Sequence, residues 1–273
     1  MRDFAFPGTT ALITGAASGI GEALAHDLAG RGCALALLDR DAAGLDRVAR
    51  RCRALGADTS VHVVDLSDGA DRADLAEEVL DRHQRVDLLV NNAGVALAGE
   101  LHQVGIEDFD WLMEVNFRAV VTTTMAFLPH LRGNPGAHVV NTSSLFGLVA
   151  PAGQVAYAAS KFAVRGFTEA LRHELAGRGV GVTVVHPGGV KTGIATSARL
   201  GRGTDDEQRA ARDEFTKHLT MPPATAARLI TEAVRTRKPR LVITRTAKVL
   251  DLLARLVPGR YATVLTALSG LRK

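Results

Sequence analysis

The chain has 273 residues, 47% of them hydrophobic, and a formal net charge of +4. This length and apolar content predict one α/β domain with a substantial core, and no nucleic-acid partner is expected. The two cysteines, Cys33 and Cys52, are better interpreted as free thiols than as a disulfide framework. No secretory leader is recognisable and no apolar run approaches the ~18 residues of a membrane span, so a cytoplasmic protein is expected.

Short apolar runs rich in Val and Leu alternate with helical patterns along the chain. Such runs are typical of strands that are covered on both faces. Strands are expected at residues 11–14, 34–39, 60–64, 86–90, 138–142, 180–186 and 241–244. Helical patterns such as 21–30 and 158–176 separate them. The order predicts a Rossmann-type, doubly wound sheet of about seven mainly parallel strands, with helices on both faces and a single domain over residues 1–273.

A glycine-rich turn follows the first expected strand directly and precedes a helical pattern. Glycine lets the backbone turn tightly and approach a pyrophosphate, and the N–H groups at a helix start favour an anion. The spacing is GxxxGxG rather than the GxGxxG of the general dinucleotide fingerprint. The candidate contacts in this turn are Thr14, Gly15, Ser18, Gly19, Ile20 and Gly21.

Acidic residues end the second and third expected strands. Asp39 can accept hydrogen bonds from both hydroxyls of an adenosine ribose and would repel a 2′-phosphate, which favours NAD. Arg40 is adjacent and can pair with that phosphate, so NADP stays open as the alternative. Asp65, followed by Leu66, can hydrogen-bond the adenine amino group or instead cap the next helix.

Tyr157 and Lys161 lie four residues apart, and Ser144 lies thirteen residues before the tyrosine. An ammonium one helical turn away favours the phenolate, and lowering a phenol pKa from about 10 to about 7 takes roughly 4 kcal/mol. A serine hydroxyl can hydrogen-bond a substrate oxygen as charge develops on it. The three residue types predict an acid/base site for a hydroxyl or carbonyl group, although an isolated Tyr-x-x-x-Lys is commonly only a surface pair.

With these residues placed, the chain resembles the short-chain dehydrogenase/reductase family, in its single-domain branch. The resemblance covers about Thr9 to Thr192. It depends on several motifs in order: the turn from Thr14 to Gly21, Asp65-Leu66, Asn91-Asn92-Ala93-Gly94, Asn116, Ser144, Tyr157 with Lys161, and Pro187-Gly188.

The resemblance implies a role for each matching residue. Tyr157 is the general acid/base, Ser144 orients the substrate oxygen, and Lys161 lowers the tyrosine pKa and holds the nicotinamide ribose. Asn116 holds a water that connects Lys161 to bulk solvent. Further cofactor contacts are implied for Asn92, Ala93, Gly94, Pro187, Gly188, Val190 and Thr192. Ser143 is expected to be structural, and Gly189 departs from the family pattern in a way that is expected to loosen the turn.

The resemblance also indicates a substrate lid over residues 193–220. Residues expected near the substrate are mostly apolar: Val95, Leu145, Phe146, Val149, Gln154 and Val190. They favour a neutral, lipophilic secondary alcohol or ketone, although Arg199 and Arg202 could reach in from the lid. The polar stretch 201–217 predicts a solvated helix. No metal site is expected, since Gly177 stands where His173-Glu174 would need a second histidine.

The C-terminal end is expected to be a helical extension over residues 246–273, broken at Pro258-Gly259. It carries two apolar stripes: Val249, Leu252, Leu253 and Leu256, then Tyr261, Val264, Leu265, Leu268 and Leu271. They are expected to cover the substrate side of the domain or a neighbouring subunit of a homodimer or homotetramer. From Arg235 to Lys273 ten Lys and Arg residues accompany Asp251 as the one acid. Solvated helix faces explain this charge most simply, and peripheral membrane contact is the alternative.

Two rival functions stay open at this point. The same fold can serve as a catalytically silent nucleotide sensor or scaffold, because fold alone does not establish function. A membrane-peripheral, lipid-modifying enzyme is the other rival, and the basic C-terminal extension is its motivation.

Overall fold

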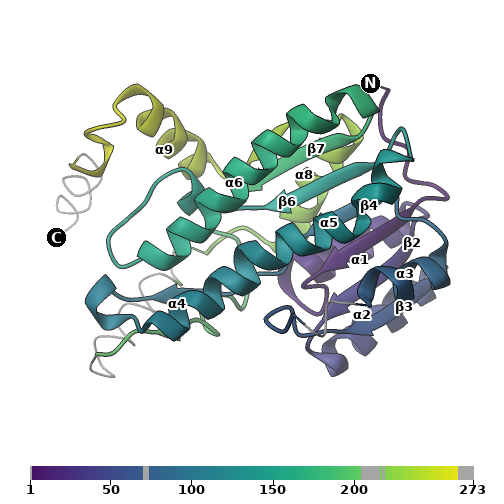
Figure 1. Cartoon of the computed structure of the whole chain (residues 1–273), viewed down its shortest axis with the longest axis horizontal. Coiled ribbons are helices and arrows are strands. Elements are labelled where there is room, and N and C mark those ends of the chain that lie inside the picture. Colours follow the sequence, from purple (N-terminus) through teal and green to yellow (C-terminus); the bar gives the residue numbers. More distant parts are fainter. Residues whose placement is uncertain (1, 70–73, 204–215, 217–218, 264–273) are drawn as a thin grey trace.

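The computed structural model describes residues 2–69, 74–203, 216 and 219–263. Most of the polar stretch 201–217 therefore lies outside the described residues, and so do residues 264–273 of the second apolar stripe. Within the described residues the chain folds around one parallel sheet with helices on both faces (Figure 1). The fold class predicted from the sequence is confirmed.

Seven parallel strands form the main sheet, in the order β3-β2-β1-β4-β6-β7-β9. They are β1 (Thr10–Thr14), β2 (Ala34–Asp39), β3 (Thr59–Val63), β4 (Leu88–Asn91), β6 (His138–Thr142), β7 (Gly181–His186) and β9 (Arg240–Val242). Each lies within two residues of its predicted position. The strand order reverses direction between β1 and β4, and a crevice at the carboxyl ends of the strands is expected at such a reversal.

Two very short strands were missed by the sequence analysis. They are β5 (Leu97–Ala98) and β8 (Arg199–Leu200), which pair in parallel as a separate small sheet. Two residues carry no detectable periodicity, so this pairing of distant segments left no sequence signal.

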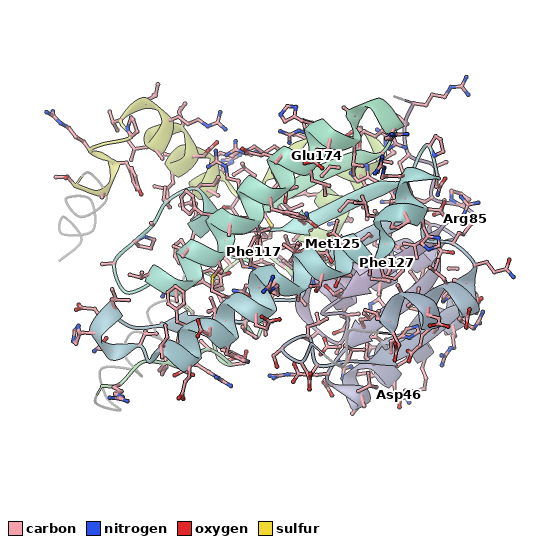
Figure 2. The ribbon with its side chains drawn as sticks, viewed as in Figure 1. Asp46, Arg85, Phe117, Met125, Phe127 and Glu174 are labelled. Atoms are coloured by element: carbon pink, nitrogen blue, oxygen red, sulfur yellow. The ribbon has the colours of Figure 1, made fainter. Side chains whose placement is uncertain are left out.

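Helices cover the sheet in two layers. The described helices are α1 (Gly19–Gly30), α2 (Ala42–Ala54), α3 (Leu75–His83), α4 (Ile106–Met113), α5 (Ala119–Arg132), α6 (Val155–Leu175), α8 (Pro223–Arg235) and α9 (Arg245–Leu256). The core that α1, α2 and α8 form with one sheet face includes Leu28, Val48 and Ile230. The core on the other face includes Val79 of α3, Phe127 of α5 and Leu171 of α6. On α5, Phe127 is fully buried while Met125 is exposed, and both are labelled in Figure 2.

A line of buried polar side chains crosses the second core. Asn91 of β4 donates to Thr124 Oγ1 (3.0 Å) and to Asn141 Oδ1 of β6 (2.8 Å). Asn141 in turn donates to Thr168 Oγ1 of α6 (3.0 Å). The line joins α5, two central strands and α6, so it fixes their relative positions next to the carboxyl edge of the sheet.

The last described helix departs from prediction. α9 lies beyond the carboxyl edge of the sheet, at the upper left of Figure 1. Val249, Leu252 and Leu256 of the first apolar stripe are exposed. The expectation that this stripe covers the chain's own substrate side is therefore wrong for these three residues, because the helix packs through its opposite side, on Ala247.

Candidate active site

A cavity of about 740 Å³ opens at the carboxyl edge of the sheet, where β1 and β4 meet. Nearly all of the sequence-predicted site residues line it, although they come from segments spread between β1 and β7. The exceptions are Thr14, Gly21 and Asn116, which lie behind the wall. The volume falls within the usual range for small-molecule sites.

The glycine turn after β1 has the conformation that its sequence requires. Gly15 and Gly19 adopt positive φ angles of 67° and 59°. A Cβ added to Gly21 would lie 2.0 Å from Gly15 O, so a side chain there would displace the turn. α1 begins at Gly19, which directs the start of the helix at the cavity. The arrangement supplies N–H groups and a positive helix end for an anion.

Thr14 holds this turn rather than lining the cavity. Its Oγ1 accepts hydrogen bonds from Asn92 N and Ala93 N, both at 3.0 Å. The side chain of Asn92 returns the contact by donating to Gly15 O (3.3 Å). The turns after β1 and β4 are therefore tied together.

Asp39 ends β2 in the cavity wall, half-buried, and Arg40 beside it is exposed. The Asp39 carboxylate accepts from Ala17 N (3.1 Å) and from Asp41 N (3.1 Å). A carboxylate has about four lone-pair sites, so Asp39 can still accept hydrogen bonds from a ligand. Asp65 also lines the cavity, where its Oδ1 accepts from Ser67 N (2.8 Å) and Ser67 Oγ (2.7 Å).

Ser144, Tyr157 and Lys161 meet at the inner end of the cavity. Ser144 follows β6 and accepts from Phe146 N (3.1 Å), while Tyr157 and Lys161 come from the first turns of α6. The Tyr157 side chain is hydrogen-bonded to that of Ser144. Lys161 is buried, and its Nζ donates to Thr142 O (3.2 Å) and lies 5.8 Å from the centroid of the Tyr157 ring. Sequence-distant groups thus converge as the family resemblance implied.

The expected lowering of the tyrosine pKa does not appear in the protein alone. Burial raises the pKa of Tyr157 above its ordinary value, and the hydrogen bond with Ser144 opposes this rise. Burial also lowers the pKa of Lys161 from 10.5 to about 8. Desolvation therefore outweighs the attraction that we expected from the ammonium, although a lysine with this pKa is still mostly charged at pH 7.

Asn116 lies behind Lys161 in a π-helical turn, Glu114–Arg118, between α4 and α5. Its Oδ1 accepts from Val95 N (2.8 Å), and its Nδ2 donates to Val95 O (3.0 Å) and Ser160 Oγ (3.1 Å). A Cβ added to Gly94 would lie 3.1 Å from Lys161 Nζ and 3.2 Å from Asn116 Oδ1. Because Gly94 has no side chain, Lys161 Nζ has room beside it. The Asn116 amide binds the backbone of Val95, just before β5. π-turns are frequent at functional sites.

Two neighbours of the serine are structural. Ser143 Oγ donates to Lys161 O (2.8 Å), which confirms its predicted packing role. His186, the last residue of β7, places Nδ1 3.0 Å from Ser144 O. Burial lowers the pKa of His186 to about 4, so the ring is neutral and Nδ1 donates to this carbonyl. His186 was not predicted as part of the site, although it directly precedes the Pro-Gly motif.

The turn before the lid and the arginines within the lid both depart from prediction. Gly189 O accepts from Thr220 N and Met221 N, both at 3.0 Å. The carbonyl of the glycine expected to loosen this turn is therefore held by two neighbouring backbone N–H groups. Arg199 places its Cζ 3.6 Å from the centroid of the Trp111 ring and donates to Asp108 Oδ1 (2.9 Å). Neither Arg199 nor Arg202 is among the described residues that line the cavity, so the expectation that they reach in is wrong.

The substrate end is partly as predicted. Val95, Leu145, Phe146 and Val190 line the cavity, whereas Val149 and Gln154 are absent from its described lining. Thr244 was missed. It follows β9, lines the cavity and has φ 76° and ψ 147°, a conformation that β-branched residues rarely adopt. Its Oγ1 accepts from Ala247 N (3.2 Å) and so starts α9. Its place at the carboxyl end of the last predicted strand, residues 241–244, is the one signal that could have identified it.

The described residues offer no candidate for a membrane-spanning helix or for a metal site. None of their helices is both long and apolar enough to cross a bilayer. They also hold no group of three or more His, Cys, Asp or Glu side chains that could bind a metal ion.

Known proteins resemble this chain over most of its length. The family model described as short chain dehydrogenase matches residues 9–203. The Mycobacterium tuberculosis protein SadH, named as an oxidoreductase, is 41% identical over 265 residues, covering 96% of this chain and 95% of the relative.

Solved structures agree with this match. A short chain dehydrogenase/reductase from Burkholderia phymatum in complex with NAD has a TM-score of 0.87 and 34% identity, covering 93% of this chain and 95% of that one. A short-chain dehydrogenase from Sphingobium yanoikuyae in complex with NADPH has a TM-score of 0.77 and 28% identity, covering 97% and 94%. Both forms of the nicotinamide cofactor thus occur among the structural neighbours.

Proposed function

The chain belongs to the short-chain dehydrogenase family of oxidoreductases, and from this premise we propose that it interconverts a secondary alcohol and its ketone with a nicotinamide cofactor. The observation that supports this proposal is the meeting of Ser144, Tyr157 and Lys161 in one cavity that also receives the glycine turn after β1. Each residue alone has an ordinary structural explanation. Together, at the edge where the strand order reverses, they form an acid/base site beside an anion site.

The residues present fit a nicotinamide dinucleotide. The start of α1 suits the pyrophosphate, and Asp39 lies in the same wall with lone pairs to spare. At the other end, a buried ammonium has three donors, and within the described residues Lys161 Nζ uses one of them, on Thr142 O. Ribose hydroxyls are suitable acceptors for the remaining donors. When bound, the nicotinamide ring accepts or supplies the hydride.

The chain's own side chains would manage the proton. In the oxidative direction the deprotonated Tyr157 oxygen takes the proton of the substrate hydroxyl as a hydride leaves the carbon atom that bears this hydroxyl. Ser144 donates a hydrogen bond to the same substrate oxygen and holds it in place. In the reductive direction Tyr157 returns its proton to that oxygen. Lys161, charged at neutral pH, stabilises negative charge as it develops on this pair of oxygens.

NAD is the proposed cofactor because Asp39 lies where a 2′-phosphate would bring a second negative charge. A neutral, lipophilic substrate is proposed because the substrate end of the wall carries Leu145, Phe146 and Val190. With Arg199 bound to Asp108 and Trp111, a carboxylate or phosphate substrate would lack that cationic partner.

The test combines binding with turnover. Fluorescence titrations with NADH and NADPH come first, followed by a panel of apolar secondary alcohols and ketones. Tyr157→Phe should lower kcat by at least about 100-fold, as expected for a general acid/base. It should leave NADH binding unchanged, because the phenol oxygen is the only group removed. Turnover by this variant at the wild-type rate would show that Tyr157 is not the acid/base. Binding without turnover in the wild type would favour a sensor.

A further inference from the structure

α9 presents an apolar surface to solvent, formed by Val249, Leu252 and Leu256. Their exposed fractions are 64%, 57% and 71%. Spacings of three and four residues bring them onto one side of the helix. The opposite side carries Ala247, which is fully buried, and the half-buried Ala254. The helix is therefore anchored to the protein by one side, and among the described residues nothing covers the continuous apolar strip on its other side.

Cations border this strip. Arg245, Lys248 and Arg255 are all exposed, and Arg245 and Lys248 have no ion-pair partner within the described part of the chain. Asp251 is the one acid of the helix. Arg240 neutralises it through two hydrogen bonds (2.9 and 2.6 Å), and Arg255 Nε adds a third (3.2 Å). The surface that faces solvent is thus both apolar and positively charged.

This combination suits one kind of partner. A two-fold contact between copies of the chain would bring Arg245, Lys248 and Arg255 of one copy near the bordering cations of the other, and like charges repel. An anionic bilayer instead offers acyl chains for the leucines and negative headgroups for the cations. α9 has 12 residues, so it would lie in the plane of the interface rather than span it.

The position of α9 gives such contact a consequence for the site. Thr244 and Thr246, at the start of the helix, line the cavity. At the other end, Tyr261 Oη accepts from Ala150 N (3.2 Å), which connects the chain after α9 to the loop that follows Ser144. We propose that α9 is an interfacial helix that docks on an anionic bilayer and places the mouth of the cavity at the membrane surface, from which an apolar substrate can enter. The second half of this proposal rests on the function proposed above.

The docking test uses the full chain and large vesicles. Co-sedimentation would compare phosphatidylcholine vesicles with mixed phosphatidylserine/phosphatidylcholine vesicles, at low and high salt. We expect binding to the anionic vesicles that weakens with salt. The triple variant Val249→Ser/Leu252→Ser/Leu256→Ser should lose at least about tenfold in binding. Arg245→Gln and Lys248→Gln should each lose about fivefold, the value of one surface cation near an anionic leaflet.

Ile106→Ser is the matched control, because Ile106 on α4 is as exposed as Leu256, at 71%. It should bind vesicles as the wild type does. Absence of wild-type binding to anionic vesicles, or equal binding by the triple serine variant, would overturn the docking proposal. A change of oligomeric state in the triple variant, without vesicle binding by the wild type, would instead make α9 a subunit interface and would equally overturn it.

Substrate entry needs a separate measurement. The triple serine variant should keep its turnover of a short, water-soluble ketone and show a raised KM for a long-chain ketone dissolved in vesicles. Equal KM values for the long-chain ketone would refute entry from the bilayer. If the wild type reduces no ketone at all, the proposed function fails, while the co-sedimentation result still decides whether α9 binds membranes.

Discussion

Replacing Lys161 by methionine should stabilise the cofactor-free protein at neutral pH while it destroys the site. Burial lowers the pKa of Lys161 from 10.5 to about 8. This shift corresponds to a buried charge that lowers the free energy of unfolding by about 3 kcal/mol. Methionine has a similar length and no charge, so Lys161→Met removes this cost. Part of the gain is offset because the hydrogen bond from Nζ to Thr142 O is lost as well.

The sign of the pH dependence follows from proton linkage. Below pH 8 the lysine is protonated in both folded and unfolded states, so its cost is constant. Between pH 8 and pH 10.5 the unfolded chain binds a proton that the folded one has released, so wild-type stability rises with pH relative to the variant. The advantage of Lys161→Met should therefore shrink by about 2–3 kcal/mol between pH 7 and pH 10.

Urea denaturation of both proteins at several pH values measures this difference, because groups unaffected by the change cancel. Lys238→Met removes an exposed lysine and should give a pH curve parallel to that of the wild type. Titration with NADH should show much weaker binding by Lys161→Met. If the wild-type and Lys161→Met curves run parallel from pH 7 to pH 10, Lys161 is not a buried cation with a lowered pKa and our reasoning about its charge is wrong.

Three further changes test other parts of the site. Asp39→Ala should narrow or reverse a preference for NADH over NADPH by about 1–3 kcal/mol, and a wild-type preference for NADPH would contradict this reading. Gly188→Ala should destabilise the protein by about 1–3 kcal/mol in urea denaturation, because its Cβ would lie 2.3 Å from Thr244 Oγ1; unchanged stability would mean that the threonine can move aside. Arg199→Ala should release β8 from Trp111 and raise KM several-fold at constant kcat, because a cation–π contact of this kind contributes about 1 kcal/mol. An unchanged KM would show that the contact does not position the lid.

The sheet was predictable because each strand carries its own signal. Runs such as Ala34–Asp39 are apolar enough to be recognised singly, and the order of strands and helices then specified the doubly wound class. The convergence of Tyr157, Lys161 and the glycine turn was predictable for a related reason. Residues that follow parallel strands share one edge of the sheet, whatever their separation in the chain.

Features that depend on a contact between distant segments were not predictable. The sequence offers Arg199 as a lid cation, but only its neighbours Asp108 and Trp111, ninety residues earlier, decide where the guanidinium points. Gly189 looked permissive, and hydrogen bonds from Thr220 and Met221 remove that freedom. The pKa of Tyr157 depends on burial, which raises it, and on the hydrogen bond with Ser144, which opposes the rise, and the spacing of Tyr157 and Lys161 along a helix reveals neither effect.

The π-helical turn at Glu114–Arg118 makes the support behind Lys161 sensitive to the insertion or deletion of a residue. A π-turn holds one more residue than an α-turn, so deletion of a single residue there would restore regular helix while α4 and α5 keep nearly the same relative rotation. Leu112 would stay in its core, but the backbone at Asn116 would move and its amide would lose both bonds to Val95. In relatives, a gap at this point should therefore mark a different support behind the lysine, even where every residue of the site is retained.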